Sequence, residues 1–182
     1  MIKAIDDTIE LEKIIGEVLE NQSDLPSERI LNAISVRGQN LSKLIGKDVY
    51  KSYELSDLVI IFEVIFNPNS TDNVSMEEED ESITVYSAFY VKILIYGNKS
   101  ANVANKLKGR LLSRKVRDDL HAKGIHVERI SNPEPMTEIL NETIWVRNDL
   151  TMEIACRQSF NQKEPDYQMN DLDGLDFKET EE

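Results

Sequence analysis

The sequence predicts a single α+β domain, in which a mainly antiparallel sheet of about four strands is packed on one face by an N-terminal and a central helix. Three observations support this prediction. The chain has 182 residues, of which 40% are apolar, enough for one hydrophobic core. Two long segments show the apolar spacing of amphipathic helices, and several shorter runs have the composition of strands. No internal repeat is visible, so we assign residues 1–160 to one domain.

The first predicted helix covers residues 2–21. Isoleucine, leucine and valine recur there at spacings of three and four, with acidic residues between them, which produces one apolar face. Residues 27–46 leave two interpretations open. The helical spacing continues through them and favours a second helix, but residues 34–38 also fit a short strand.

Two strands form the centre of the predicted sheet. Residues 58–66 are a β-branched and aromatic run that stops at Asn67 and Pro68, and residues 83–96 form a longer second strand. Between them lies an acidic loop at residues 67–82. A strand of this length after so polar a loop predicts an extended hairpin that projects beyond the sheet.

The central helix is predicted at residues 98–123, where an apolar stripe runs up to the helix stop at Gly124. A short strand at 125–130 follows, then a turn region around Pro133 and Pro135. An alternating strand at 149–160 completes the domain. Residues 161–182 have no apolar period, and we expect this acidic tail to be flexible or ordered by a partner.

The net charge of −13 is concentrated in two segments. Residues 76–82 carry −5 and residues 161–182 carry −6, so the rest of the chain is nearly neutral. Residues 99–123 carry eight bases against two acids, a net charge of +6. The acidic loop holds Glu77, Glu78, Glu79, Asp80 and Glu81. The basic helix holds Lys106, Lys108, Arg110, Arg114, Lys115 and Arg117.

The residue patterns give no indication of catalysis, of a cofactor or of a metal site. His121 and His126 lack the i, i+4 spacing and the intervening glutamate of a zinc protease pair. The single cysteine, Cys156, lies within a predicted strand, where burial would make it a poor nucleophile. No apolar run reaches the roughly 18–20 residues that cross a bilayer. We therefore expect a protein that is not an enzyme and does not enter a membrane.

Two groups of side chains are candidates for a subunit interface. The basic helix could contact phosphates, form a solvated face, or meet an acidic surface of a neighbouring copy in a ring. We favour a neighbouring copy over nucleic acid, because no aromatic residues interleave the bases and the whole chain is acidic. Tyr86, Tyr90 and Tyr96 share one face of the second strand, and they suit either an interface or ordinary burial.

The order and texture of these segments resemble those of phage tail terminator and neck proteins, which complete tails and join them to heads. The resemblance rests on the opening helix, on LVIIFEVIF, SITVYSAFYVKILIYG, ANVANKLKGRLLSRKVRDDLHAKGIHVERI and RNDLTMEIACRQSF. It implies a structural virion protein that forms a ring, commonly a hexamer, at the head-proximal end of the tail. The implied partners are further copies of the chain, the tail tube protein and the head–tail connector. The implied location is the virion, after assembly in the host cytoplasm.

A channel for DNA gives the acidic loop a physical role. Acidic residues repel phosphates, so genomic DNA would slide past them without specific binding. We therefore expect Glu77, Glu78, Glu79, Asp80 and Glu81 to face the lumen or rim of the ring, with a loop that only aids solubility as the alternative. Two other functions stay open: another ring of the same particle (a head–tail adaptor or a tail tube subunit) and a nucleic-acid-associated module that uses residues 99–123.

Overall fold

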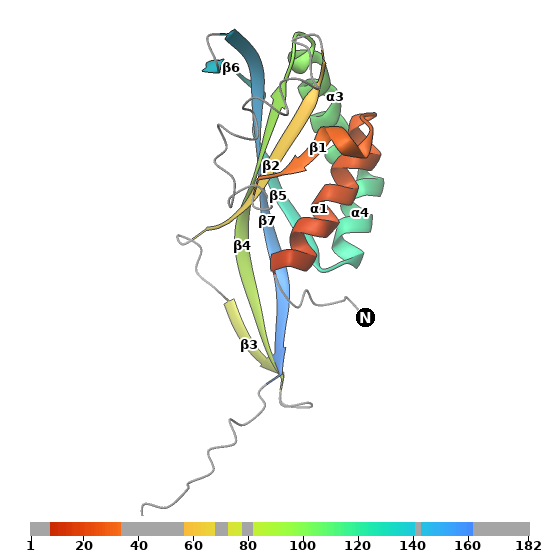
Figure 1. Cartoon of the computed structure of the whole chain (residues 1–182). Coiled ribbons are helices and arrows are strands. Elements are labelled where there is room, and N and C mark those ends of the chain that lie inside the picture. The colour runs from red at the N-terminus through yellow and green to blue at the C-terminus, as the bar shows by residue number, and fades with distance from the viewer. Residues whose placement is uncertain (1–7, 34–56, 68–72, 78–81, 141–142, 162–182) are drawn as a thin grey trace, which may run out of the picture.

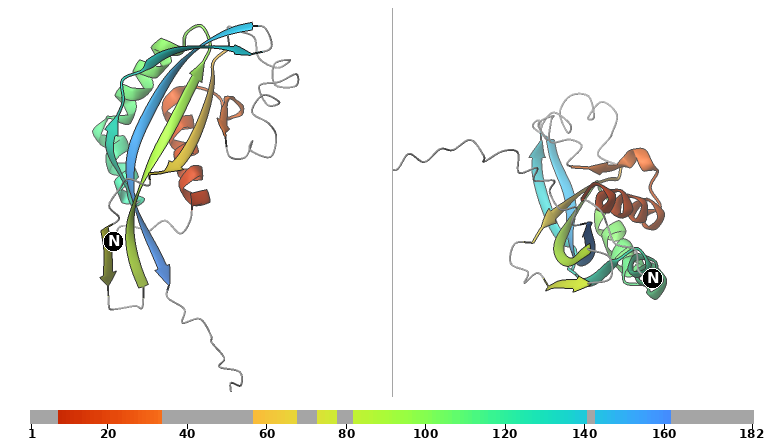
Figure 2. Two further views of the ribbon diagram at one scale, coloured as in Figure 1. Left: turned by 90° about the vertical axis from the view of Figure 1, so that its left-hand side faces the viewer. Right: turned by 90° about the horizontal axis from the view of Figure 1, so that it is seen from below.

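The computed structural model describes residues 8–33, 57–67, 73–77, 82–140 and 143–161. Within these ranges, three α-helices pack on one mixed sheet of seven strands. All three helices lie on the same face of the sheet (Figures 1 and 2). The α+β class and the one-sided helical cover are therefore confirmed. The expected number of about four strands is too low.

Along the chain, α1 precedes four strands, and α3 with α4 separates these from the last three strands. The bounds are α1 (Thr8–Ser23), the 3-10 turn η1 (Ser27–Arg29), β1 (Ile30–Asn32), β2 (Val59–Phe66), β3 (Asn73–Glu77), β4 (Ser82–Tyr96), α3 (Ser100–Leu111), α4 (Arg114–Ala122), β5 (Ile125–Ile130), β6 (Glu134–Leu140) and β7 (Thr143–Asn161). The strand order is β1-β2-β4-β7-β5, with β3 beside β4 and β6 beside β7. Every pair is antiparallel except β1–β2.

The antiparallel pair β4–β7 runs through the whole molecule. Its register extends from Tyr96↔Arg147 at one end to Ser82↔Asn161 at the other. Strand β2 pairs with the C-terminal half of β4, and β3 pairs with its N-terminal half. Beyond the helices, β3 and the ends of β4 and β7 continue as a narrow extension, which we call the arm (Figure 1). The predicted extended hairpin is thus present as β3 and β4.

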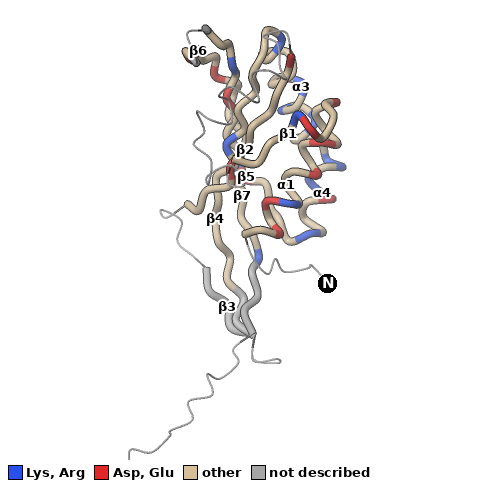
Figure 3. Tube along the Cα trace, in the orientation of Figure 1, with Lys and Arg blue, Asp and Glu red and all other residues tan. Residues whose placement is uncertain are grey.

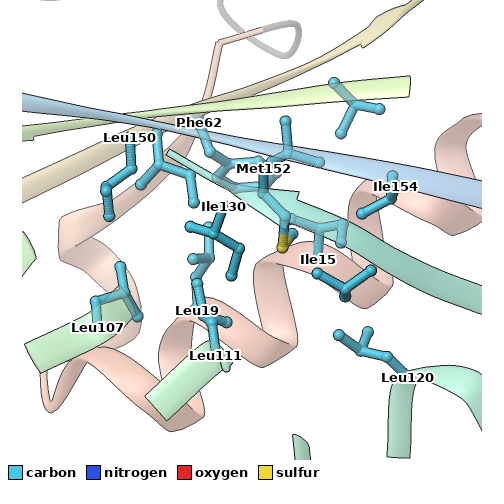
Figure 4. Packing of buried hydrophobic residues seen from close by; sticks show 14 of the residues in the cluster. Ile15, Leu19, Phe62, Leu107, Leu111, Leu120, Ile130, Leu150, Met152 and Ile154 are labelled. Carbon is cyan, nitrogen blue, oxygen red and sulfur yellow. The ribbon is translucent and has the colours of Figure 1, made fainter. Parts of the chain in front are cut away.

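The hydrophobic core lies between the sheet and the helices. Alternate residues of β4 and β7 point towards the helices, and Val91, Ile93, Met152 and Ile154 are completely buried there. The helices contribute Ile15, Leu19, Leu107, Leu111 and Leu120 (Figure 4). A smaller cluster on the opposite face of the sheet contains Ala33, Val59, Ile61, Tyr96 and Trp145. Among the described residues, the sheet therefore carries a large cluster on the helical face and a smaller one on the opposite face near β6.

The preference for a helix across residues 27–46 is wrong at its start. Pro26 has extended backbone angles, η1 lasts for three residues, and Ile30 is already extended. Residues 30–32 then pair in parallel with β2, with Ile30 opposite Ile60. Pairing with a buried strand overrides the local helical spacing, because the strand edge supplies hydrogen bonds. The alternative strand at 34–38 lies outside the described residues.

The single helix predicted at 98–123 is two helices. The backbone of Ser113 is extended (φ −62°, ψ 144°), and its Oγ accepts a hydrogen bond from the N–H of Val116 at 3.5 Å. Ser113 is therefore the N-cap of α4. The buried residues Leu107, Leu111, Val116 and Leu120 are four, five and four apart. The step of five marks the position of the break.

The turn predicted around Pro133 and Pro135 is instead strand β6, which begins at Glu134. It pairs with β7, which starts at Thr143 rather than at residue 149. Proline is tolerated in β6 because this strand is paired on one side only among the described residues. The strands β6 and β7 form a second hairpin at the end of the molecule opposite the arm (Figure 1).

Candidate assembly surfaces

The hairpin of β6 and β7 exposes four large apolar side chains. Ile139 is 74% exposed and Ile144 is 63% exposed, and these two residues face each other across the hairpin. Val146 lies beside them on the same face, and Met136 lies on the opposite face. Soluble monomers rarely keep apolar side chains grouped at a protruding site. We call the group Ile139, Ile144 and Val146 the apolar strip.

A polar cluster at the base of this hairpin fixes its position. The hydroxyl of Tyr96 donates to Oε2 of Glu138 at 2.9 Å, and Nη1 of Arg147 donates to the same Oε2 at 2.7 Å. Arg147 also forms an ion pair with Asp149 at 3.0 Å. Burial raises the pKa of Tyr96 to about 12 and also raises the pKa of Asp149. These contacts join the base of the hairpin to β4 within the subunit.

Three tyrosines of β4 lie on the face of the sheet away from the helices, as their spacing predicts. Tyr86 is 44% exposed, Tyr90 is half-buried, and Tyr96 is buried at 4% exposure. The smaller cluster of the chain itself covers Tyr96, where the ring meets Trp145 edge-on. Tyr86 lies opposite Arg157 of β7. Of the three, Tyr86 and Tyr90 keep surface for a neighbouring molecule.

The prediction of a loop throughout residues 67–82 is wrong at 73–77, which form strand β3 and pair with β4. Glu77 is the last residue of β3, and its backbone pairs with Ser82, the first residue of β4. Glu78, Glu79, Asp80 and Glu81 lie outside the described residues. The ends of β3 and β4 that flank these four residues lie at the end of β4 farthest from the β6–β7 hairpin (Figure 1).

Two of the basic side chains of α3 hold the end of α1. Asp24 follows α1 with a positive φ of 62° and forms ion pairs with Lys106 at 3.0 Å and with Arg110 at 2.8 Å. Hydrogen bonds from Arg110 and then Lys106 lower the pKa of Asp24 to about 2. Arg110 also donates to the carbonyl of Gln22 at 2.7 Å. These contacts join residues about eighty positions apart, which sequence spacing does not reveal.

Of the remaining basic side chains in α3 and α4, two bind groups within the subunit and two are exposed to solvent. Lys108 donates to Asn132 at 2.6 Å, and Arg117 donates to the carbonyl of Val127 at 3.1 Å. Arg114 and Lys115 are exposed at the start of α4, and Arg114 pairs only loosely with Asp118 at 3.5 Å. The basic helix of the sequence thus divides into residues that stabilise the subunit and residues that face solvent. Figure 3 shows the basic positions along α3 and α4.

A shallow cleft of about 340 Å³ lies between α4 and β5. Its lining consists of Leu112, Arg114, Arg117, Asp118, His121, His126 and Val127. The rings of His121 and His126 stand 6.4 Å apart and nearly perpendicular. Arginine and histidine side chains outnumber the single carboxylate, so the cleft suits an anionic ligand with an apolar part.

The described residues hold no recognisable centre for chemistry. Cys156 is buried, and burial raises the pKa of its thiol to about 12, so it stays protonated. Within the described ranges, no group of three or more histidine, cysteine or acidic residues is placed to hold a metal ion. None of the described helices is both long and apolar enough to cross a membrane.

Sequence reasoning missed the β6–β7 hairpin and its apolar strip. The available signal was the pair of short runs PMTEIL and TIWV, separated by Asn141 and Glu142. Two β-prone runs around a short polar pair indicate a hairpin. Pro133 and Pro135 favoured the prediction of a turn, because proline is common in turns.

Comparison with known proteins agrees with a role in assembly. A search of curated proteins gives no match. A protein-family model described as "Phage neck terminator protein" matches residues 10–182. The match includes every strand, all of α3 and α4, and most of α1. Since it covers nearly the whole chain, the protein belongs to the phage neck terminator family, whose members are structural components of the virion.

Proposed function

We propose that this protein forms a ring at the head-proximal end of a phage tail, where it terminates the tail tube and joins it to the head–tail connector. The observation that carries the proposal is the exposed apolar strip on the β6–β7 hairpin, in a chain of the neck terminator family. A ring needs a heterologous contact, in which one surface of a subunit meets a different surface of the next. A protruding apolar hairpin suits one half of such a contact.

The opposite half of the contact has two candidate surfaces. Tyr86 and Arg157 are neighbours on the face without helices, and aromatic residues and arginine are enriched at interfaces. Arg114 and Lys115 at the start of α4 are exposed and suit an acidic surface of the adjacent subunit. Tyr86 and Arg157 lie at the start of the arm, where Tyr86 pairs with Asn73 of β3, and Arg114 and Lys115 lie on the helical side of the body.

The acidic tip of the arm would face the lumen or rim of this ring. Glu77 and the four acidic residues after it place five like charges where two strands turn. Such a lining repels DNA and lets it pass without being held. Replacing all five with lysine should slow DNA exit while assembly continues. Unchanged ejection in that variant would remove the proposed role of the tip.

The test of the proposed function is the mass and shape of the purified protein, alone and with isolated tail tubes. Mass photometry should show a discrete oligomer, for which a hexamer has six times the 20.9 kDa subunit mass. Electron microscopy should show that oligomer at one end of each tube. Long tubes made of this protein alone would identify a tube subunit instead. A monomer that leaves tube ends bare would contradict the proposal.

The nucleic-acid alternative is less favoured than a ring. Lys106, Arg110 and Arg117 are engaged by partners within the subunit, which leaves few side chains of the basic helix to follow a phosphate backbone. A DNA-binding module would show affinity that falls steeply with salt, because each phosphate contact releases counterions. We expect the purified protein to show no such affinity.

A further inference from the structure

The cleft between α4 and β5 has a chemistry that the ring proposal does not use. It combines the half-exposed Leu112 with Arg114, Arg117, His121 and His126, and Asp118 is its single acidic residue. The ion pair of Arg114 with Asp118 is long, at 3.5 Å, and its side chains are 95% and 69% exposed. Such an exposed pair is weak, so Arg114 is able to exchange Asp118 for another carboxylate.

We propose that residues 171–177 of the same chain fold back and bind in this cleft. This segment reads DLDGLDF, so three carboxylates alternate with Leu172, Leu175 and Phe177. The apolar side chains match Leu112, and the carboxylates match the arginine and histidine donors. The acidic loop at residues 77–81 contains five acids and no apolar residue. It therefore fits the cleft less well than the C-terminal segment does.

The end of β7 brings the segment within reach of the cleft. Strand β5, which contributes His126, pairs with β7 next to Cys156, and the N–H of Arg157 donates to the carbonyl of Gly124 at 3.0 Å. From Cys156 to Asn161 the strand advances by roughly 17 Å. The ten residues from there to Asp171 span up to about 33–36 Å when extended. The segment can therefore return to its own cleft without strain.

Occupation of the cleft would have a consequence for DNA in the neck. The side chain of Arg114, with its guanidinium group, is 95% exposed in this cleft and would otherwise be open to phosphates. An acidic segment in the cleft neutralises that group and competes with phosphates for the same donors. This inference concerns the single subunit, so it does not depend on ring formation.

The test is disulfide trapping in the full chain. Leu112→Cys combined with Leu175→Cys should form an intramolecular disulfide at micromolar protein, because a docked segment has a high effective concentration. The native Cys156 does not interfere, since it is buried with a pKa of about 12. The matched control is Ile9→Cys with Leu175→Cys. Ile9 is 74% exposed against 44% for Leu112, so an undocked segment would react faster with the control position.

We expect the Leu112 pair to form at least about tenfold faster than the Ile9 pair. That advantage should shrink in 1 M salt, where the screening length falls to about 3 Å, and when Asp171, Asp173 and Asp176 are changed to Asn. Equal rates for the two pairs would overturn the proposal. Disulfides only between different chains would overturn it too, and would give the cleft to a neighbour's segment. Duplex DNA binding that Arg114→Glu abolishes would identify a nucleic-acid site instead.

Discussion

Replacing Ile139 and Ile144 with lysine should prevent assembly while the subunit stays folded. In the subunit these side chains are already 74% and 63% exposed, so their loss should change the free energy of unfolding by less than about 0.5 kcal/mol. Full burial of an isoleucine contributes about 1.5–3 kcal/mol. Because about two-thirds of each side chain is still exposed in the subunit, burying that surface at a contact would contribute roughly 1–2 kcal/mol per residue to association. The pair is therefore worth on the order of 30- to 1000-fold in the association constant.

Mass photometry across a dilution series measures this loss, and urea unfolding followed by circular dichroism checks the fold. The matched control is Ile9→Lys, because Ile9 is also 74% exposed but lies at the start of α1, away from the hairpin. The double variant should be monomeric at concentrations where the wild type and the control form oligomers. An unchanged oligomer in the double variant would refute the assignment of the apolar strip to the subunit contact. An equal loss in Ile9→Lys would refute it as well.

Three further predictions concern the subunit itself. Ser113→Ala removes the N-cap of α4 and should lower the free energy of unfolding by about 0.5–2 kcal/mol in urea titrations. Gly97→Ala should lower it by more than about 1 kcal/mol, because φ is +116° and the new Cβ would lie 2.3 Å from the carbonyl oxygen of Asp57. Asp24 has a pKa of about 2 in the folded protein, below the ordinary value of 3.8 for an aspartate side chain. It therefore stabilises the fold above pH 3.8, and this contribution disappears as the pH falls through 2. The melting temperatures of the wild type and Asp24→Asn should differ at pH 6 and converge near pH 2.

Each of these predictions has a result that contradicts it. Normal stability of Ser113→Ala would mean that α3 and α4 are held apart by packing alone. Tolerance of Gly97→Ala would mean that the backbone at Asp57 moves freely away from the new methyl group. A constant difference between the wild type and Asp24→Asn from pH 6 to pH 2 would mean that the charge of Asp24 is not responsible for its effect. Urea unfolding of the wild type and of Asp24→Asn at each pH measures that difference in the free energy of unfolding.

Elements whose identity depends on their own residues were predictable from the sequence. The β-branched run of β2 and the alternation in β4 each determine a strand, and both were placed within one residue of their bounds. The face of β4 that carries Tyr86, Tyr90 and Tyr96 also followed from alternation alone. Helical spacing accounts for Leu11, Ile15, Leu19, Leu107 and Leu111 in the core. It does not account for the buried Ile14, and Ile9 fits the spacing although it is 74% exposed.

Features that depend on distant partners were not predictable. Residues 30–32 became a strand because β2 offers them an edge, and nothing in their own spacing indicates that neighbour. The bases Lys106 and Arg110 were interpreted as an interface, whereas Asp24, far away in sequence, engages both. The apolar strip was missed because the prolines before it are typical of turns as well as of edge strands.

The uninterrupted β4–β7 ladder has a mechanical consequence. Strand β4 has 15 residues, each of them paired with a residue of β7, so the ladder extends for roughly 50 Å from the arm to the hairpin. A pull directed along these strands would load all the rungs in parallel, rather than opening them one after another. Neither strand has a break within the ladder at which the extension could bend independently of the body. The β4–β7 ladder can therefore carry a pulling force from the arm to the hairpin as shear across all of its backbone hydrogen bonds.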